Sequence, residues 1–146
     1  MRAQIATILG VPVFVDFSLI FLILFFAGPE LRSGQSELML IGLAIAAALI
    51  GSIFIHEMAH AIAGRRFGVA ASHIELNALG GYCAFERSLP GGVLPQLVVS
   101  AVGPLSNLLL WGLCQFLATL EPVSSSGTAY AIVAQVGEIN LLLFLL

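Results

Sequence analysis

The sequence predicts an all-α polytopic membrane protein with about four transmembrane helices and a short β-hairpin-like segment between the second and third. The first observation is composition, because the chain is 60% hydrophobic and 9% charged, against roughly 25% charged residues in soluble domains. The second is a mean hydropathy of +1.08. The third is that four apolar stretches each approach the roughly 20 residues that a helix needs to cross about 30 Å of hydrocarbon.

These stretches follow one another closely, so residues 1–146 are predicted to form a single domain. The predicted spans are residues 11–28, 38–64, 93–120 and 129–146. The first is too apolar over too great a length, and lacks the small-residue cleavage site, for a removable signal peptide. Asp16 near its start is expected to be an interfacial carboxylate or helix cap.

The second span ends in a helix-stop signal. Gly64, Arg65, Arg66 and Gly68 lie at its end, and a C-terminal glycine with nearby cations suits the negative end of a helix dipole. The arginines also predict orientation. Arg2, Arg65, Arg66 and Arg87 fall on one side of a four-span topology and Arg32 on the other, which places the N-terminus and the segment after span two in the cytoplasm.

Residues 69–85 change period. His73, Glu75 and Asn77 alternate with apolar residues, which indicates a β-hairpin or an irregular strand pair. Gly80 and Gly81 interrupt the alternation. They either allow a second backbone to come close or form a simple turn.

The third and fourth spans carry small and polar residues inside apolar sequence. Gly103 and Pro104 predict a face that packs closely on another span. Asn107, on the same face, is interpreted either as a packing contact or as a contact to substrate and transition state. The fourth span contains Glu138, expected to be protonated or paired with a neighbouring amide, and Asn140.

The residues with the clearest chemistry lie at the end of span two. His56 and His60 enclose Glu57 in an HExxH motif. Residues four apart share one face of a helix, so both imidazoles reach one metal ion, and the adjacent glutamate addresses a water there. This is the zinc pattern of metalloproteases. Random placement would give the motif on the order of 0.003 times per chain.

Other interpretations of the motif fit less well. Unmetallated histidines would leave three polar side chains without an obvious partner in hydrocarbon, where titratable groups are costly and usually functional. A bis-histidine haem site requires ligands from opposite sides of the ring. Cys83 and Cys114 are isolated and predicted to be free thiols, and no basic patch predicts nucleic-acid binding.

Together these motifs resemble the site-2 protease family of intramembrane zinc metalloproteases. The resemblance extends from Val11 to the C-terminus. It comprises the HExxH motif with the following Arg66-Phe67-Gly68, the Leu79-Gly80-Gly81 turn, the Gly103-Pro104-Leu105-Ser106-Asn107 element, and Ile139-Asn140-Leu141-Leu142.

The resemblance implies an enzyme that cleaves transmembrane segments of other proteins in the bilayer, with Zn²⁺ on His56 and His60 and Glu57 as catalytic base. Gly80 and Gly81 would receive the unwound substrate, and Asn107 would contact it. The expected location is the plasma membrane, with the N-terminus and the active-site side cytoplasmic. The sequence indicates no oligomeric state.

The motif that carries the family's third zinc ligand is not among these 146 residues. The third zinc ligand is expected to be an aspartate in an Asp-Gly motif beyond Leu146, so we expect the domain to be incomplete at its C-terminus and the 146 residues alone to be inactive. Asp16, His73 and Glu138 are the candidates for a replacement ligand within the chain. The alternative is a degenerate, non-catalytic relative that acts as a membrane metal-binding or scaffold protein.

Overall fold

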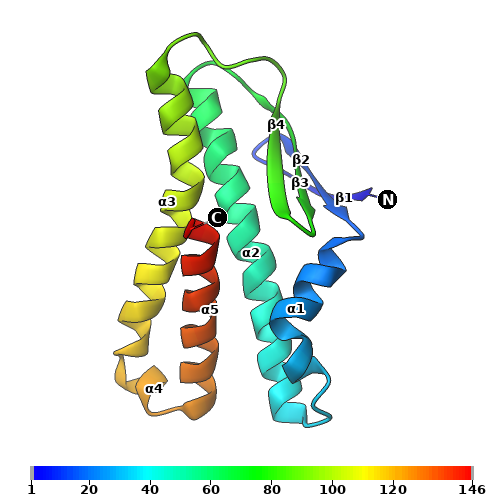
Figure 1. Cartoon of the computed structure of the whole chain (residues 1–146), viewed down its shortest axis with the longest axis vertical. Helices are drawn as coiled ribbons and strands as arrows, with labels where there is room; N and C mark the ends of the chain where they lie inside the picture. The colour runs from blue at the N-terminus through cyan, green and yellow to red at the C-terminus, as the bar shows by residue number, and fades with distance from the viewer. Residues whose placement is uncertain (1, 146) are drawn as a thin grey trace.

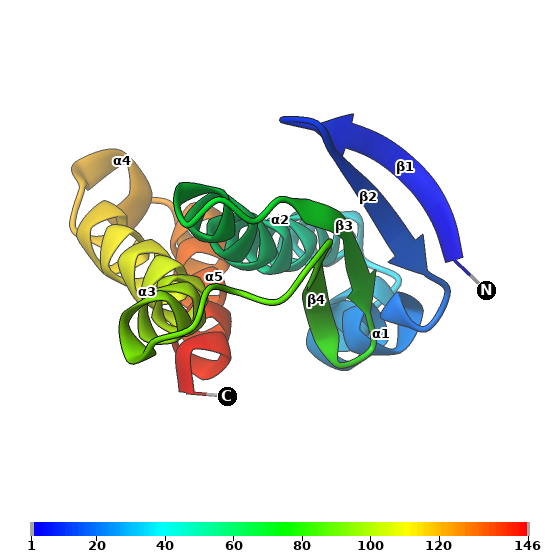
Figure 2. The same cartoon turned by 90° about the horizontal axis from the view of Figure 1, so that it is seen from above.

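The computed structural model describes residues 2–145, which form a helical bundle with a small sheet against it (Figure 1). Helix α2 is central. Helices α3 and α5 pack on one side of it, and the sheet and helix α1 lie on the other side (Figure 2). The elements are β1 (Arg2–Ile8), β2 (Val11–Asp16), α1 (Leu19–Leu31), α2 (Ser36–Arg66), β3 (Ala71–Asn77), β4 (Gly80–Phe85), α3 (Val93–Ala118), α4 (Glu121–Ser124) and α5 (Gly127–Leu145).

Three helices, α2, α3 and α5, are long and apolar enough to cross a membrane. They correspond to the second, third and fourth predicted spans. Their outward surfaces are apolar: Leu40 and Leu109, for example, are 65% and 75% exposed, as expected where lipid rather than protein covers a helix. Helix α2 has 31 residues, or about 46 Å at 1.5 Å per residue, which exceeds the hydrocarbon thickness.

The first predicted span is wrong as a single helix. Its start forms strand β2, and the rest forms α1, whose 13 residues extend about 20 Å and are too short to cross about 30 Å of hydrocarbon. Hydropathy counts apolar residues but does not distinguish strand from helix. Burial in the structure alternates as in a strand, since Val11 and Val13 are buried while Pro12 and Phe14 are only partly covered.

The four-stranded sheet, in the order β1-β2-β3-β4, also corrects the all-α prediction. The predicted hairpin is confirmed: β3 and β4 pair antiparallel, with Asn77 opposite Gly80. Strands β1 and β2 form a second hairpin, and β2 pairs parallel with β3 through residues 13–15 and 74–76. Leu9 and Gly10 connect β1 to β2 with φ of 52° and 81°, the positive values of a type I′ turn.

The predicted end of α2 is confirmed and connects the bundle to the sheet. The Gly68 N–H donates to the Arg65 carbonyl and the Val69 N–H to the Gly64 carbonyl. With Gly68 at φ 77°, this is a Schellman motif. The Arg65 guanidinium donates to the Leu9 carbonyl at 2.7 Å, so the last turn of α2 holds the β1–β2 turn in place.

The sheet packs on α2 through a core of aliphatic side chains. Ile74 and Leu76 of β3 are 0% and 1% exposed and face Ile53 and other buried residues of α2. At the end of β4, the Phe85 ring lies on Gly64 so closely that a Cβ built there would overlap ring atom Cε1. A glycine at position 64 therefore sets how near the hairpin approaches α2.

We expect Gly64→Ala to destabilise the docking of β4 on α2 by about 1–3 kcal/mol, the usual cost of overpacking. Thermal unfolding in detergent measures the loss. Gly51→Ala is the matched control, because nothing lies within 4 Å of a Cβ there and alanine favours a helix by up to about 1 kcal/mol. Adding Phe85→Leu should rescue Gly64→Ala, and equal stability of the two single variants would contradict the packing argument.

Candidate active site

The HExxH motif lies on α2 about 15 Å of helix before its C-terminal end, inside the bundle. The imidazoles of His56 and His60 lie one turn apart in an edge-to-face arrangement, with ring centroids separated by 4.9 Å. Both rings face α3. The shared helix face predicted from the spacing is confirmed by this geometry.

Each imidazole is oriented by a group on α3 that contacts Nδ1. The Nδ1 atom of His60 lies 2.5 Å from the Val99 carbonyl oxygen. The Nδ1 atom of His56 lies 2.9 Å from Nδ2 of Asn107. In both rings this leaves Nε2 as the nitrogen directed at the space between the helices.

Gly103 of α3 lies opposite the two Nε2 atoms. A Cβ built on this glycine would overlap Nε2 of His56 and Nε2 of His60 together. The two nitrogens therefore converge on one small space that exists because residue 103 has no side chain. The sequence predicted close packing around Gly103, but it did not show that the partners are the two histidines.

Glu57 faces the sheet rather than α3. Its side chain is 6% exposed and lies under Gly81 of β4, where a Cβ would come within 3.0 Å of Cγ and 3.1 Å of Oε1. Gly81 therefore allows the Glu57 side chain to come close to β4, whereas the approach of a second backbone to the glycine pair stays a prediction. Gly80, with φ 112°, supplies the turn.

Two cavities flank the motif, and His56, Glu57 and Gly81 line both. The smaller, about 180 Å³, is also lined by Ile53, Leu79, Gly80, Asn107 and Leu143. The larger, about 420 Å³, is also lined by His60, Tyr82, Cys83, Phe85, Leu89, Val99 and Ser100. Strand β4 runs beside both cavities, so space is available on each side of Glu57 along the strand.

The edge of β4 that faces the cavities is open. Strand β4 pairs with β3 and stands last in the sheet order of the described strands. Its backbone donors and acceptors on the other edge are available for another extended chain.

Helix α5 is fixed to α2 one turn before the motif. The Asn140 side chain, 0% exposed, donates to the Ser52 hydroxyl at 3.0 Å and to the Val136 carbonyl at 2.9 Å. Ser52 was not singled out from the sequence, since a serine in a small-residue helix carries no local signal. The Val99 carbonyl was also missed, because any residue has one.

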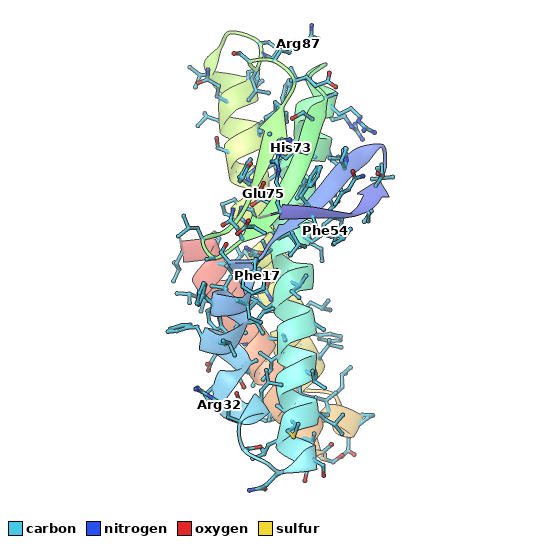
Figure 3. All side chains as sticks on the ribbon, turned by 90° about the vertical axis from the view of Figure 1, so that its right-hand side faces the viewer. Phe17, Arg32, Phe54, His73, Glu75 and Arg87 are labelled. Atoms are coloured by element: carbon cyan, nitrogen blue, oxygen red, sulfur yellow. The ribbon has the colours of Figure 1, made fainter. Side chains whose placement is uncertain are left out.

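The candidate replacement ligands lie elsewhere. Between residues 2 and 145, no group of three His, Cys, Asp or Glu side chains is arranged to hold a metal ion. His73 lies on the sheet in a network with Arg2, Glu75 and Tyr82, as the labels in Figure 3 show for His73 and Glu75. Asp16 accepts hydrogen bonds from Ser18, which hold its pKa well below the usual range, and it caps the turn into α1. Glu138 is exposed on α5.

Comparison with known proteins identifies the family. The model of peptidase family M50 matches residues 44–143, more than half of the chain, including every side chain that lines the two cavities. The chain belongs to peptidase family M50. This confirms the resemblance to site-2 proteases and, with three apolar helices, identifies an integral membrane protein.

A solved structure supports the fold of this M50 chain. The site-2 protease from Methanocaldococcus jannaschii superposes with a TM-score of 0.73 at 16% sequence identity. The alignment covers 99% of this chain and 62% of the solved one, so the chain spans under two thirds of that protease. No curated protein matches the sequence.

M50 peptidases are generally zinc-dependent, and the site in this chain fits two of the zinc ligands. The Nε2 atoms of His56 and His60 converge on the space opposite Gly103, which a single Cβ would fill. Imidazole nitrogen is a common zinc ligand at about 2.0–2.1 Å. The Nδ1 atom of His60 faces the Val99 carbonyl, an outer acceptor of the kind that metal-binding histidines ordinarily have.

We expect Gly103→Ala to abolish or strongly weaken zinc binding, because the methyl group would occupy the space between the two Nε2 atoms. Gly112→Ala is the matched control on the same helix, since nothing lies within 4 Å of a Cβ at that position. Zinc titration against a chelating dye in detergent measures both variants. Wild-type affinity in Gly103→Ala would show that the metal does not bind at this point.

Cys83, free and half-buried in β4, should resist alkylation at neutral pH. Burial, with the nearby charge of Glu57 as a second cause, raises the pKa of its thiol to about 12. The thiolate is the reactive form, and a high pKa leaves only a small fraction of Cys83 as thiolate. A thiolate of high pKa is more nucleophilic, but this compensates for only part of the smaller fraction. We therefore expect labelling about 50-fold slower than at an exposed thiol. The rate should rise with pH until the pKa is reached.

The control for Cys83 is Leu79→Cys in a Cys83→Ala background, because Leu79 is 97% exposed on the same hairpin. The measurement is the maleimide labelling rate at pH 8. Equal rates at the two positions would be inconsistent with a desolvated Cys83.

Proposed function

We propose that this chain carries the core of an intramembrane zinc metalloprotease, which hydrolyses peptide bonds within transmembrane segments of other membrane proteins. The proposal rests on the arrangement of His56, Glu57 and His60 inside an apolar helix bundle. The two Nε2 atoms point to one space that could hold a metal ion, and the open edge of β4 lies beside Glu57. Family membership supports the reaction class.

His56 and His60 would hold the ion through Nε2. Zinc, when bound, supplies Lewis-acid polarisation of a peptide carbonyl and of a water molecule. The remaining steps are proton transfers and positioning, and both depend on side chains of this chain. The bundle around the site limits access of bulk water, which strengthens the electrostatic interactions inside it.

Glu57 is proposed as general base and acid. It lies next to His56 in sequence, and its carboxylate faces the two cavities. Glu57 would take a proton from a water molecule in one of these cavities and later deliver the proton to the leaving amine. The two roles together restore Glu57 at the end of a cycle.

Strand β4 is proposed to bind the substrate. An α-helix hides its carbonyls in internal hydrogen bonds, so a transmembrane substrate must unwind before attack. The open edge at Gly80 and Gly81 can then pair with the extended segment by strand addition, beside Glu57. Substrates with helix-breaking residues near the cleaved bond are therefore favoured.

The proposed setting is a multi-pass protein of the plasma membrane, with its N-terminus and the end of α2 on the cytoplasmic side. The excess of arginine on that side supports this orientation. Its partners would be transmembrane protein substrates and the bilayer itself. The second candidate is a degenerate relative that holds metal through His56 and His60, whose Nε2 atoms converge on one space, without catalysis.

The test compares Glu57→Gln with the unmodified complete gene product. Glu57→Gln should retain zinc but lower cleavage of a labelled transmembrane peptide with an internal helix-breaking residue by at least about 10²-fold, because the base is lost. Glu138→Gln, an exposed carboxylate on α5, is the control and should cleave normally.

Cleavage by Glu57→Gln at the normal rate would refute Glu57 as the base. Zinc binding without any cleavage by the unmodified protein would favour the degenerate relative.

A further inference from the structure

The side-chain amide of Asn107 is buried beside a proposed metal ligand, and only one of its two ends has a hydrogen-bond partner. The side chain is 0% exposed, and its Nδ2 lies 2.9 Å from Nδ1 of His56. Its Oδ1 is buried without a hydrogen-bond partner. A buried amide that directs one end at a histidine ring nitrogen and leaves the other unpaired affects which ring nitrogen carries the proton.

His60 provides an internal comparison. Its Nδ1 faces the Val99 backbone carbonyl, which can only accept, so this ring must carry its proton on Nδ1 and present an Nε2 lone pair. The backbone of α3 fixes that arrangement. The tautomer of His60 that can bind a metal through Nε2 is therefore set by the backbone and does not depend on a neighbouring side chain.

His56 differs because its partner is a side-chain amide that can present either end. With Nδ2 donating to Nδ1, the neutral ring carries its proton on Nε2, the atom that faces Gly103. That tautomer cannot ligate a metal through Nε2. Rotation of the amide by a half turn places Oδ1 against Nδ1, because the two ends have nearly the same shape.

We propose that Asn107 is a positioning residue for the metal ligand His56: zinc binding selects the amide orientation in which Oδ1 accepts the Nδ1 proton of His56. This inference rests on the proposed function. It assigns Asn107 a third role, beside the packing and substrate contacts that the sequence left open. The amide then acts on the metal through the imidazole.

The surroundings of Asn107 favour this role over packing. One end of the amide lacks a partner in either orientation, a cost that a leucine of similar size would avoid. What the amide offers and leucine lacks is an acceptor for the Nδ1 proton. Outer partners of this kind typically change metal affinity by 10–100-fold.

The experiment measures zinc affinity, by competition with a chelating dye in detergent, for the complete gene product and three variants. Asn107→Leu removes the acceptor and should weaken binding about 10–100-fold. Asn107→Asp keeps an acceptor and should bind as tightly as the unmodified protein or more tightly. Asn140→Leu is the matched control, since Asn140 is equally buried with an unpaired Oδ1 but contacts Ser52 rather than a histidine.

Unchanged affinity in Asn107→Leu, or equal losses in Asn107→Leu and Asn107→Asp, would overturn the inference. Far-UV circular dichroism and thermal unfolding identify a variant that fails to fold. Absence of zinc binding by the unmodified protein would remove the proposed function as well, which separates the two failures.

A second measurement needs no variant. The chain has three histidines, so ¹⁵N spectra of histidine-labelled protein can resolve the tautomer of each ring. Addition of zinc should move the His56 proton to Nδ1, with Nε2 bound to the metal. A zinc-loaded His56 coordinated through Nδ1 would overturn the inference.

Discussion

Close approach of neighbouring backbones to α2 is the constraint on which the site depends. Gly103 of α3 lies against the two imidazoles, and Gly81 of β4 lies on Glu57. A side chain at either glycine would push its element away from the motif. The site is therefore compact because α3 and β4 contact neighbouring faces of the same turn of α2 through backbone atoms.

The apolar surroundings impose a second requirement, since polar groups in a lipid-embedded bundle must find partners inside the protein. Val99 and Asn107 orient the two histidines, and Ser52 pairs with Asn140 one turn away. Each pair joins α2 to another helix. The contacts that satisfy the polar groups also fix the positions of α3 and α5 relative to the motif.

Much of this organisation was predictable. The apolar lengths predicted α2, α3 and α5, and the alternation after residue 69 predicted the β3–β4 hairpin. The prediction of the first span as one helix was wrong because hydropathy does not distinguish the strand at Val11 and Val13 from a helix. The apolar stretch is therefore long enough for one span but divides into β2 and α1. Strand β1 was missed because its exposed residues give little alternation.

The sequence by itself determined that the chain is a membrane protein and that His56, Glu57 and His60 share one turn of helix, since composition and an i, i+4 spacing are local properties. Tertiary structure alone decided which groups meet that turn. The partners Val99, Gly103 and Asn107 come from α3, and Val99 and Asn107 lie 39 and 51 positions beyond the histidines that they contact. A backbone carbonyl leaves no signature in a sequence, and Gly103 and Asn107 do not show which residues they will contact, so only the packing of α3 on α2 could identify these partners.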